Sequence, residues 1–386
     1  MSTNIKKTDL FWIFILLSIS GNPFFHVYIG NITYGIILLI FSVYLLLKKQ
    51  GIYSLNDKVS YILFFCIILF ALQIIVLEKV SLLASINFIV KILLGYLIIR
   101  EVNTRLPLAY LKVITFVSFV SLVLYSYVMI THNTPGIIVA NSRTLFFYTI
   151  NMGGNILSDR NAGMFWEPGA FQGYILLTPL FFLEKIDLLW TKYKTNSIIL
   201  FFTLLTTKST TGYIVLFILI IYILSSKLKS KWLRFSLFPI VIGVVFYLFF
   251  SIDFLNTKIE KEYNQALELS VETGDYSFSR FGAAVTDWYR IKQHPIIGNG
   301  FLIESRYGLT SHDLVAFGNG FTGIINVLGI PFIVLFFFLL FNNSPMKRND
   351  TLFFIMVIIL LLQGEQFLDY PLFLSLPFFV RYVIRK

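Results

Sequence analysis

Apolar runs of up to about 20 residues follow one another along most of this chain, and no other feature limits its fold as strongly. A helix needs roughly 20 apolar residues to cross the hydrocarbon core of a bilayer. Hydrophobic residues make up 57% of the sequence and charged residues only 13%, and the mean hydropathy is +0.80. Soluble domains are much less apolar. The sequence therefore predicts an all-α integral membrane protein, a single polytopic domain over residues 1–386.

The number of apolar runs predicts about twelve transmembrane helices. We expect them at residues 10–27, 32–47, 59–77, 80–99, 109–130, 171–183, 197–206, 212–224, 235–252, 319–341, 351–363 and 371–384. The runs at 197–206 and 212–224 are each short, so a single re-entrant element is the alternative interpretation there.

Basic residues divide unevenly between the two sides of these runs. Lysine and arginine are enriched in the cytoplasmic loops of membrane proteins. With both termini in the cytoplasm, the short outer connections contain only Lys79 and Lys208. The inner segments contain Lys6, Lys7, Lys48, Lys49, Lys58, Arg100, Arg105, Lys185, Lys192, Lys194, Lys227, Lys229, Lys231, Arg234, Lys347, Arg348, Arg381, Arg385 and Lys386. The net charge of +11 is therefore attributed to membrane topology, and a nucleic-acid partner is not expected.

Two outer segments, 131–164 and 253–318, are too long to be simple connections. Loops longer than about 15 residues are usually functional or disordered, and the closely spaced aromatic residues here are not typical of disorder. Within the second segment, residues 258–269 and 280–292 predict short amphipathic helices on the membrane surface. The two long outer segments are therefore where we expect the functional residues.

Five arginines lie in these two outer segments, and all four histidines also fall on the outer side. Any one arginine there is explained equally well by an ordinary surface ion pair. Five together favour an anion site, because arginine binds phosphate in a bidentate manner. The arginines are Arg143, Arg160, Arg280, Arg290 and Arg306, and the histidines are His26, His132, His294 and His312.

Two further residues are candidates for the chemistry itself. Glu167 precedes Pro168 at the expected start of a helix, where a carboxylate stabilises the helix dipole; alternatively it orients a sugar hydroxyl or pairs with Arg160. His312 is a candidate general base, although beside Asp313 it also fits a helix-capping position.

Polar residues near the membrane helices complete the list of candidates. Lys91 lies inside a predicted span, where buried charge is costly and often functional. Glu365 and Asp369 lie at the outer turn between the last two spans and would complete a site. No histidine pair has metal-ligand spacing, the chain has a single cysteine (Cys66), and no glycine-rich phosphate loop occurs. We therefore expect no metal and no nucleotide cofactor.

Four segments together resemble the bacterial O-antigen polymerases (Wzy) and the related O-antigen ligases (WaaL). They are residues 160–169 with the Glu-Pro-Gly string, KSTTGYI at 208–214, residues 280–301 with the PIIGNGF turn, and residues 312–332. Arg143 and Gly154 also match the polymerase pattern of an arginine, ten residues and a glycine. Arg290 departs from the corresponding pattern, since only nine residues separate it from Gly300.

The resemblance implies a bundle similar to the GT-C membrane glycosyltransferases, in a bacterial inner membrane, with a metal-independent active site on the periplasmic face. The growing glycan would pass from undecaprenyl diphosphate to the non-reducing end of a lipid-linked repeat unit. Arg143, Arg160, Arg280 and Arg290 would hold the diphosphate, and His312 or Glu167 would accept the proton. The implied partners are lipid-linked oligosaccharides, membrane lipid and a chain-length regulator protein.

Two alternatives remain open at this point. An O-antigen ligase would use the same donor and transfer the glycan to the lipid A core. A polysaccharide-lipid flippase or other transporter would also have about twelve helices, but transporters usually have related halves. The sequence shows no internal repeat and has its unusual residues in two unequal outer segments, which favours an enzyme over a transporter. The Glu-Pro-Gly string and the fit at Arg143 favour the polymerase over the ligase.

Overall fold

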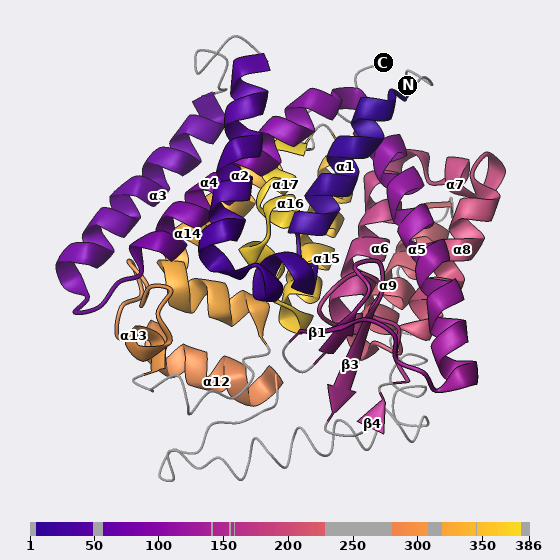
Figure 1. Cartoon of the computed structure of the whole chain (residues 1–386). Coiled ribbons are helices and arrows are strands. Elements are labelled where there is room, and N and C mark those ends of the chain that lie inside the picture. Colours follow the sequence, from indigo (N-terminus) through magenta and orange to yellow (C-terminus); the bar gives the residue numbers. More distant parts are fainter. Residues whose placement is uncertain are drawn as a thin grey trace.

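The structure is a computed structural model that describes residues 5–48, 57–139, 142–153, 156–157, 159–227, 280–307, 319–344 and 346–379. Helices dominate it (Figure 1). Four helical stretches are long and apolar enough to cross a membrane: Gly30–Lys48, Lys58–Val76, Leu82–Thr131 and Gly320–Asn343. These stretches identify the chain as a helical membrane protein. The total of twelve spans stays a prediction, and the predicted span at 235–252 lies outside the described residues.

The N-terminal third is built from helices that match the first five predicted spans. They are α1 (Lys7–Ile19), the π-helix η1 (Phe24–Tyr28), α2 (Gly30–Lys48), α3 (Asp57–Val76), α4 (Leu82–Val102), the short η3 (Asn103–Arg105) and α5 (Leu106–Thr131). The first is shorter than expected because Gly21 has φ +124° and Pro23 follows it, so α1 cannot continue.

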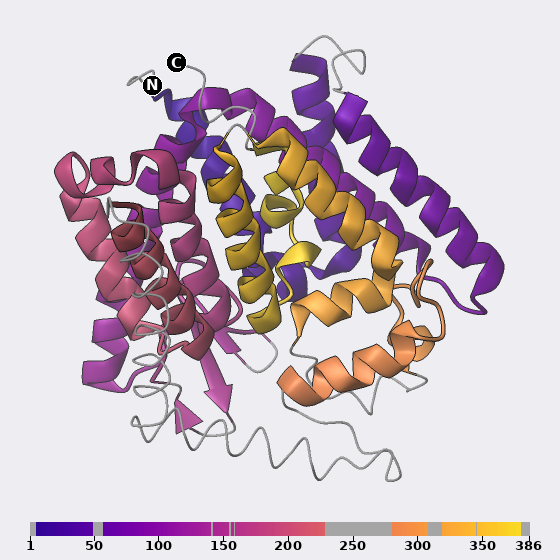
Figure 2. The same ribbon diagram turned by 180° about the vertical axis from the view of Figure 1, so that it is seen from behind.

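Two further groups of helices lie on either side of the C-terminal helices (Figures 1 and 2). One group contains α6 (Pro168–Phe181), η4 (Leu183–Lys185), α7 (Asp187–Thr191), α8 (Lys194–Thr206) and α9 (Thr210–Lys227). The other contains α12 (Arg280–Ile291), α13 (Ile303–Tyr307) and α14 (Gly320–Asn343). Between them lie α15 (Arg348–Gly364), η5 (Phe367–Asp369), α16 (Pro371–Leu374) and α17 (Leu376–Phe379).

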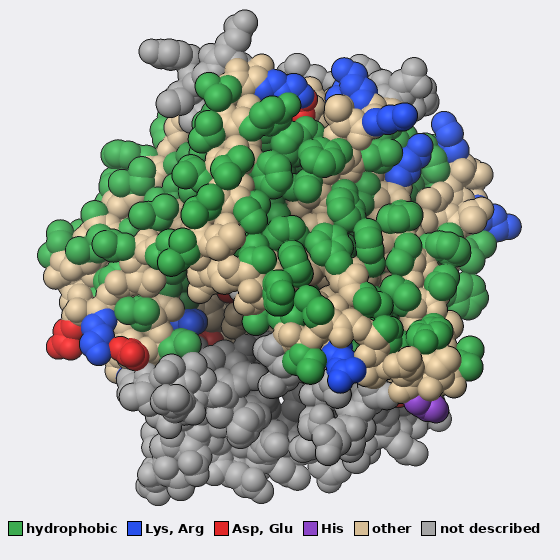
Figure 3. Space-filling view, in the orientation of Figure 1, with side chains coloured by type: hydrophobic (Ala, Val, Ile, Leu, Met, Phe, Trp, Pro, Cys, Tyr) green, Lys and Arg blue, Asp and Glu red, His purple; other side chains and the backbone are tan. Residues whose placement is uncertain are grey.

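Burial separates core helices from helices at the lipid-facing edge. Most of α4 is buried, and it packs against α2, α3, α1 and α16. On α2 and α3 large apolar side chains point outward, among them Ile36, Ile40, Tyr61 and Phe64. A broad hydrophobic surface results (Figure 3). Exposed apolar surface of this extent is expected where lipid is the solvent.

The first long outer segment folds into a small antiparallel sheet, which the sequence analysis did not predict. Its strands are β1 (Ile137–Val139), β2 (Ser142–Thr144), β3 (Thr149–Gly153) and β4 (Ile156–Leu157), in the order β1-β2-β3-β4. Buried Tyr148 and Ile150 join the sheet to Val128 of α5. In the second segment α12 confirms the predicted helix at 280–292, whereas residues 258–269 lie outside the described part.

Two predicted spans have an interrupted form. The last one, at 371–384, begins as two short helices, α16 and α17, that meet at Ser375, and its end lies outside the described residues. The other is α14, which is broken at Gly329 with φ 77° and ψ 167°, two residues before Pro331.

The turn between α12 and α13 supplies hydrogen bonds at the break in α14. Asn299 N donates to Asn326 O at 2.7 Å and Gly300 N to Val327 O at 3.1 Å. The side chain of Gln73 on α3 also donates to Val327 O, at 2.8 Å. A helix can be interrupted within a membrane protein only where neighbouring groups satisfy the freed carbonyls. This explains the Pro-Ile-Ile-Gly-Asn-Gly turn, whose backbone donors are placed against the break.

Candidate functional site

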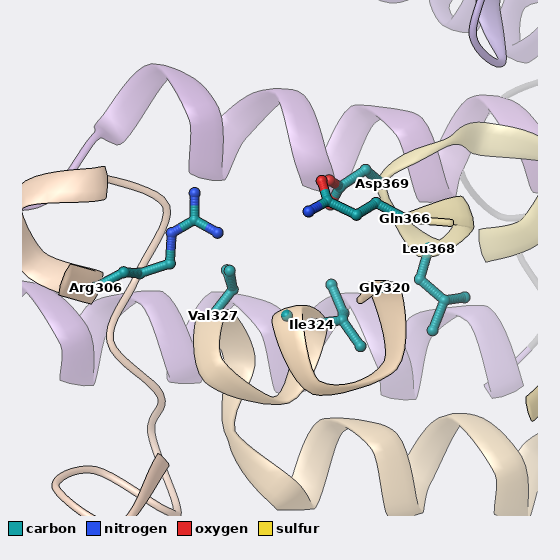
Figure 4. A pocket seen from close by; sticks show the side chains of 8 residues that line it. Arg306, Gly320, Ile324, Val327, Gln366, Leu368 and Asp369 are labelled. Carbon is teal, nitrogen blue, oxygen red and sulfur yellow. The ribbon is translucent and has the colours of Figure 1, made fainter. Parts of the chain in front are cut away.

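A polar pocket lies beside the first half of α14. About 230 Å³ of space, counting the open mouth, lies between α13, α14 and η5 (Figure 4). Its lining consists of Arg306, Gly320, Gly323, Ile324, Val327, Gln366, Leu368 and Asp369. Figure 4 shows Arg306 on one side and Gln366 and Asp369 on the other, with their polar ends directed toward one another above α14.

Asp369 is the acidic group of this pocket. It lies in η5, outside the long helices. Burial raises the pKa of Asp369 above its ordinary value, and the charges of Lys91 and Arg306 act in the opposite direction. Lys91 lies on α4, and its Nζ is 5.7 Å from the centre of the ring of Tyr34 on α2. The charged residue that the sequence places inside a span is therefore a neighbour of the pocket carboxylate.

Small residues on α14 allow the η5 turn to approach this closely. A Cβ atom on Gly320 would lie 2.0 Å from Glu365 O, so only glycine fits there. A Cβ on Gly323 would lie 3.8 Å from Gln366 Nε2 and 3.9 Å from Asp287 Oδ2. Because both positions are glycine, neither places a side chain in the space beside Glu365, Gln366 and Asp287.

Asp287 fixes the amphipathic helix α12 to the same half of α14. Its side chain is 2% exposed. Thr322 Oγ1 donates to Asp287 Oδ2 at 2.7 Å and Asn326 Nδ2 donates to Oδ1 at 2.8 Å. Asn326 Oδ1 in turn accepts from Asn299 Nδ2 at 2.8 Å. A buried carboxylate held in this way fixes the position of α12 on α14. It thereby also positions the segment that leads from α12 to Arg306.

Glu167, one of the predicted site residues, lies beside the η5 turn. It is exposed and occupies the N-cap of α6 without a side-chain capping bond. Its charge acts on Tyr370, the residue after Asp369, as does that of the buried Glu365. Glu365 also lies against the start of α6, because a Cβ on Gly169 would be 2.0 Å from its Oε1. The N-terminus of α6 and the η5 turn are therefore neighbours.

Two predicted arginines are placed elsewhere. Arg143, on β2, donates through Nη1 to both the backbone oxygen and Oγ1 of Thr134 at 2.9 Å. Arg160 donates through Nε to Thr207 O at 3.2 Å. It lies beside the α8–α9 turn, where a hydrogen bond to Asp159 raises the pKa of Lys208. Neither arginine lines the pocket formed by the described residues.

The other predicted residues give less information. Arg290 lies in the last turn of α12, and its backbone oxygen accepts from Asn299 Nδ2 at 3.0 Å. Arg280 is the first residue of α12. His312 lies outside the described residues.

Arg306, Gln366 and Asp287 were not among the residues chosen for catalysis or diphosphate binding. Arg306 belongs to the group of five outer arginines, but nothing in its local sequence identifies it as a site residue. Asp287 gives a detectable signal, since it is a carboxylate on the otherwise apolar face of an amphipathic helix, between the buried Ala283 and Ile291.

The arrangement suits a polar, anionic ligand. A guanidinium group binds phosphate or carboxylate oxygens, and an amide and a carboxylate bind hydroxyl groups. The carboxylate can also accept a proton. Among the residues that the structure describes, no three histidine, cysteine, aspartate or glutamate side chains form a group that could hold a metal ion.

No protein-family model matches the chain, and comparisons with curated proteins and with solved structures return no match.

Proposed function

We propose that this protein is a membrane glycosyltransferase of the O-antigen polymerase type. It transfers a growing glycan from undecaprenyl diphosphate to the non-reducing end of a lipid-linked repeat unit, without a metal ion. The observation that carries the proposal is the pocket in which Arg306 faces Asp369 and Gln366 beside a broken membrane helix. In this site Arg306 binds the leaving diphosphate and Asp369 is a proton acceptor alongside His312 or Glu167.

Charge distribution supports the orientation that this reaction requires. Basic side chains gather at the end of the molecule where α1 begins, and α12 and α13, the helix that carries Arg306 of the pocket, lie at the opposite end (Figures 1 and 3). By the positive-inside rule, this distribution supports a cytoplasmic N-terminus and a pocket on the outer side. The membrane proposed for this reaction is the bacterial inner membrane. Lipid-linked substrates, which need no nucleotide sugar, suit that location.

The test is a reaction with purified protein. Full-length protein in detergent is mixed with an undecaprenyl-diphosphate repeat unit, and the products are separated by length. A ladder of longer lipid-linked glycans supports the polymerase. Transfer only to added lipid A core supports a ligase instead. In the host, loss of a polymerase leaves lipopolysaccharide with a single repeat unit, whereas loss of a ligase leaves polymer on undecaprenyl diphosphate.

One observation favours a second candidate, a transporter of the lipid-linked glycan. Interrupted helices and buried charges inside spans are common in transporters, and this chain has the break at Gly329 and Lys91 within α4. A transporter makes no new glycosidic bond, so the detergent reaction separates the two classes. If only unreacted repeat units are recovered while the protein moves labelled lipid across vesicles, the enzyme proposal is wrong.

A further inference from the structure

A large apolar cavity lies among α6, α7, α8 and α9, on the other side of the molecule from α12 and α13 (Figures 1 and 2). It contains about 790 Å³ of space, counting its open mouth. Aliphatic side chains form most of its wall, among them Leu176, Leu189, Leu200, Leu204, Leu219 and Ile223. No part of the polar pocket belongs to it.

The few polar atoms in the wall make this cavity unsuitable for water. Ser197 Oγ is already bonded to Leu189 O at 2.9 Å. Thr178 Oγ1 is buried and has no hydrogen-bond partner among the described residues. A buried water needs two to four polar partners. The wall therefore favours hydrocarbon, and in a membrane protein that hydrocarbon comes from lipid.

The mouth of the cavity opens at the perimeter of the molecule. Trp190 is 57% exposed, and Phe201 and Ile220 are 42% and 40% exposed, although all three belong to the lining. Tryptophan is enriched where the hydrocarbon core meets the headgroups. Trp190 therefore indicates the level at which a lipid chain would enter.

Exposed lysines flank the lining residues of this entrance in the sequence. Lys185 precedes the lining residue Ile186, and Lys192 and Lys194 lie between the lining residues Trp190 and Ser197. Acidic residues in the same stretch of sequence are Glu184 and Asp187, and Glu184 accepts a hydrogen bond from Lys347 N at 3.1 Å. The basic groups Lys347 and Arg348 are also exposed there. Positive charge thus exceeds negative charge at the mouth of an apolar cavity.

We propose that this cavity holds an acyl chain of an anionic phospholipid whose phosphate group lies against Lys192 and Lys194. Apolar volume selects a hydrocarbon chain, and the lysines select an anionic headgroup over a zwitterionic one. The site is distinct from the pocket at α14 and does not depend on the proposed reaction. It gives the α6–α9 group a lipid that fills space which protein side chains leave open.

The test uses full-length protein in phosphatidylcholine vesicles that contain phosphatidylglycerol. Bromine atoms on the acyl chains of one lipid at a time quench nearby tryptophan, and subtracting the Trp190→Phe signal isolates Trp190. We expect brominated phosphatidylglycerol to quench Trp190 more strongly than brominated phosphatidylcholine at equal mole fraction. In the Lys192→Gln/Lys194→Gln variant the apparent affinity for the anionic lipid should fall about tenfold, since each lysine near an anionic headgroup contributes roughly fivefold before screening.

Two controls separate this site from general attraction to the membrane. Lys6→Gln/Lys7→Gln removes the same charge from the start of α1 and should leave Trp190 quenching unchanged. Leu200→Phe or Leu219→Phe fills the cavity and should reduce quenching in a protein that keeps its thermal stability. Equal quenching by both lipids, no effect of filling the cavity, or no quenching at all because protein occupies the space would each overturn the proposal.

Discussion

The two long outer segments both contain arginines, yet they are connected to the membrane helices in different ways. The first folds on itself as a four-stranded sheet, and its Arg143 bonds to Thr134 of the same segment. The second forms hydrogen bonds with α14 through Asp287 and the turn at Asn299. It also brings Arg306 to the pocket. An arginine in an outer loop therefore indicates a site only when its segment is fixed to other polar groups of the membrane helices.

Removal of the charged pair in the pocket should have the largest effect. Arg306→Ala removes the pocket guanidinium, and Asp369→Asn keeps the shape of the carboxyl group but cannot accept a proton. Each should lower the rate of glycan elongation about 100-fold or more, because loss of one preorganised electrostatic group commonly reduces the turnover rate by a factor of about 10² to 10³. The measurement is the initial rate of ladder formation with equal amounts of purified protein.

Arg306→Lys is the matched control for that experiment, since it keeps the charge and loses the bidentate geometry. It should retain more activity than Arg306→Ala. Full activity in both Arg306→Ala and Asp369→Asn would show that the second segment has no more catalytic importance than the first.

The break in α14 should be the next most sensitive feature. Gly329 has φ +77°, and a Cβ there would lie 2.2 Å from Ile296 O. Gly329→Ala should destabilise the protein by about 3 kcal/mol, from backbone strain and displacement of the turn. Gly30 has a similar φ of +76° with no atom within 4 Å of a Cβ, so Gly30→Ala should cost only about 1–2 kcal/mol. Thermal unfolding in detergent compares the two variants, and equal losses would mean that the contact with the turn is unimportant.

The break shows where sequence reasoning succeeded and where it ended. Apolar length locates α2 to α5 because lipid forces each span to satisfy its own backbone. That rule gives no information about residues whose hydrogen bonds come from other segments. Gly298 and Gly329 lie next to each other in space although 31 positions separate them in the sequence. Contacts of this kind are not encoded in any local pattern.

The candidate site was predictable to a similar extent. The intramembrane Lys91 was identified from the cost of buried charge, and Glu365 and Asp369 from their place at the outer turn between the last two spans. The selection of Arg306 over Arg143 required the fold, since the sequence pattern favours Arg143. The sheet in the first segment was missed because its strands are only two to five residues long and lack the alternation that predicts a strand.

The attachment of α12 to α14 should be moderately important for stability. Asp287→Ala leaves the side chains of Thr322 and Asn326 without their acceptor in a buried place, which should cost about 2–3 kcal/mol. Asp287→Asn keeps an oxygen for Asn326 and should cost less. Limited proteolysis measures the effect locally, and we expect faster cleavage within 280–307 for Asp287→Ala. Unchanged cleavage would show that α12 is held by its apolar face alone.

Arg143→Ala should have the smallest effect on turnover and is the sharpest test of the comparison. Its guanidinium bonds connect Thr134 to β2, so the substitution should loosen the start of the sheet by roughly 1–2 kcal/mol and change the elongation rate by less than about threefold. The resemblance to the O-antigen polymerases instead implies that Arg143 holds diphosphate. A rate as low as that of Arg306→Ala, in protein with an intact sheet, would support the diphosphate role, because lost loop bonds alone do not remove transition-state stabilisation. The first segment would then have to approach the pocket during the reaction.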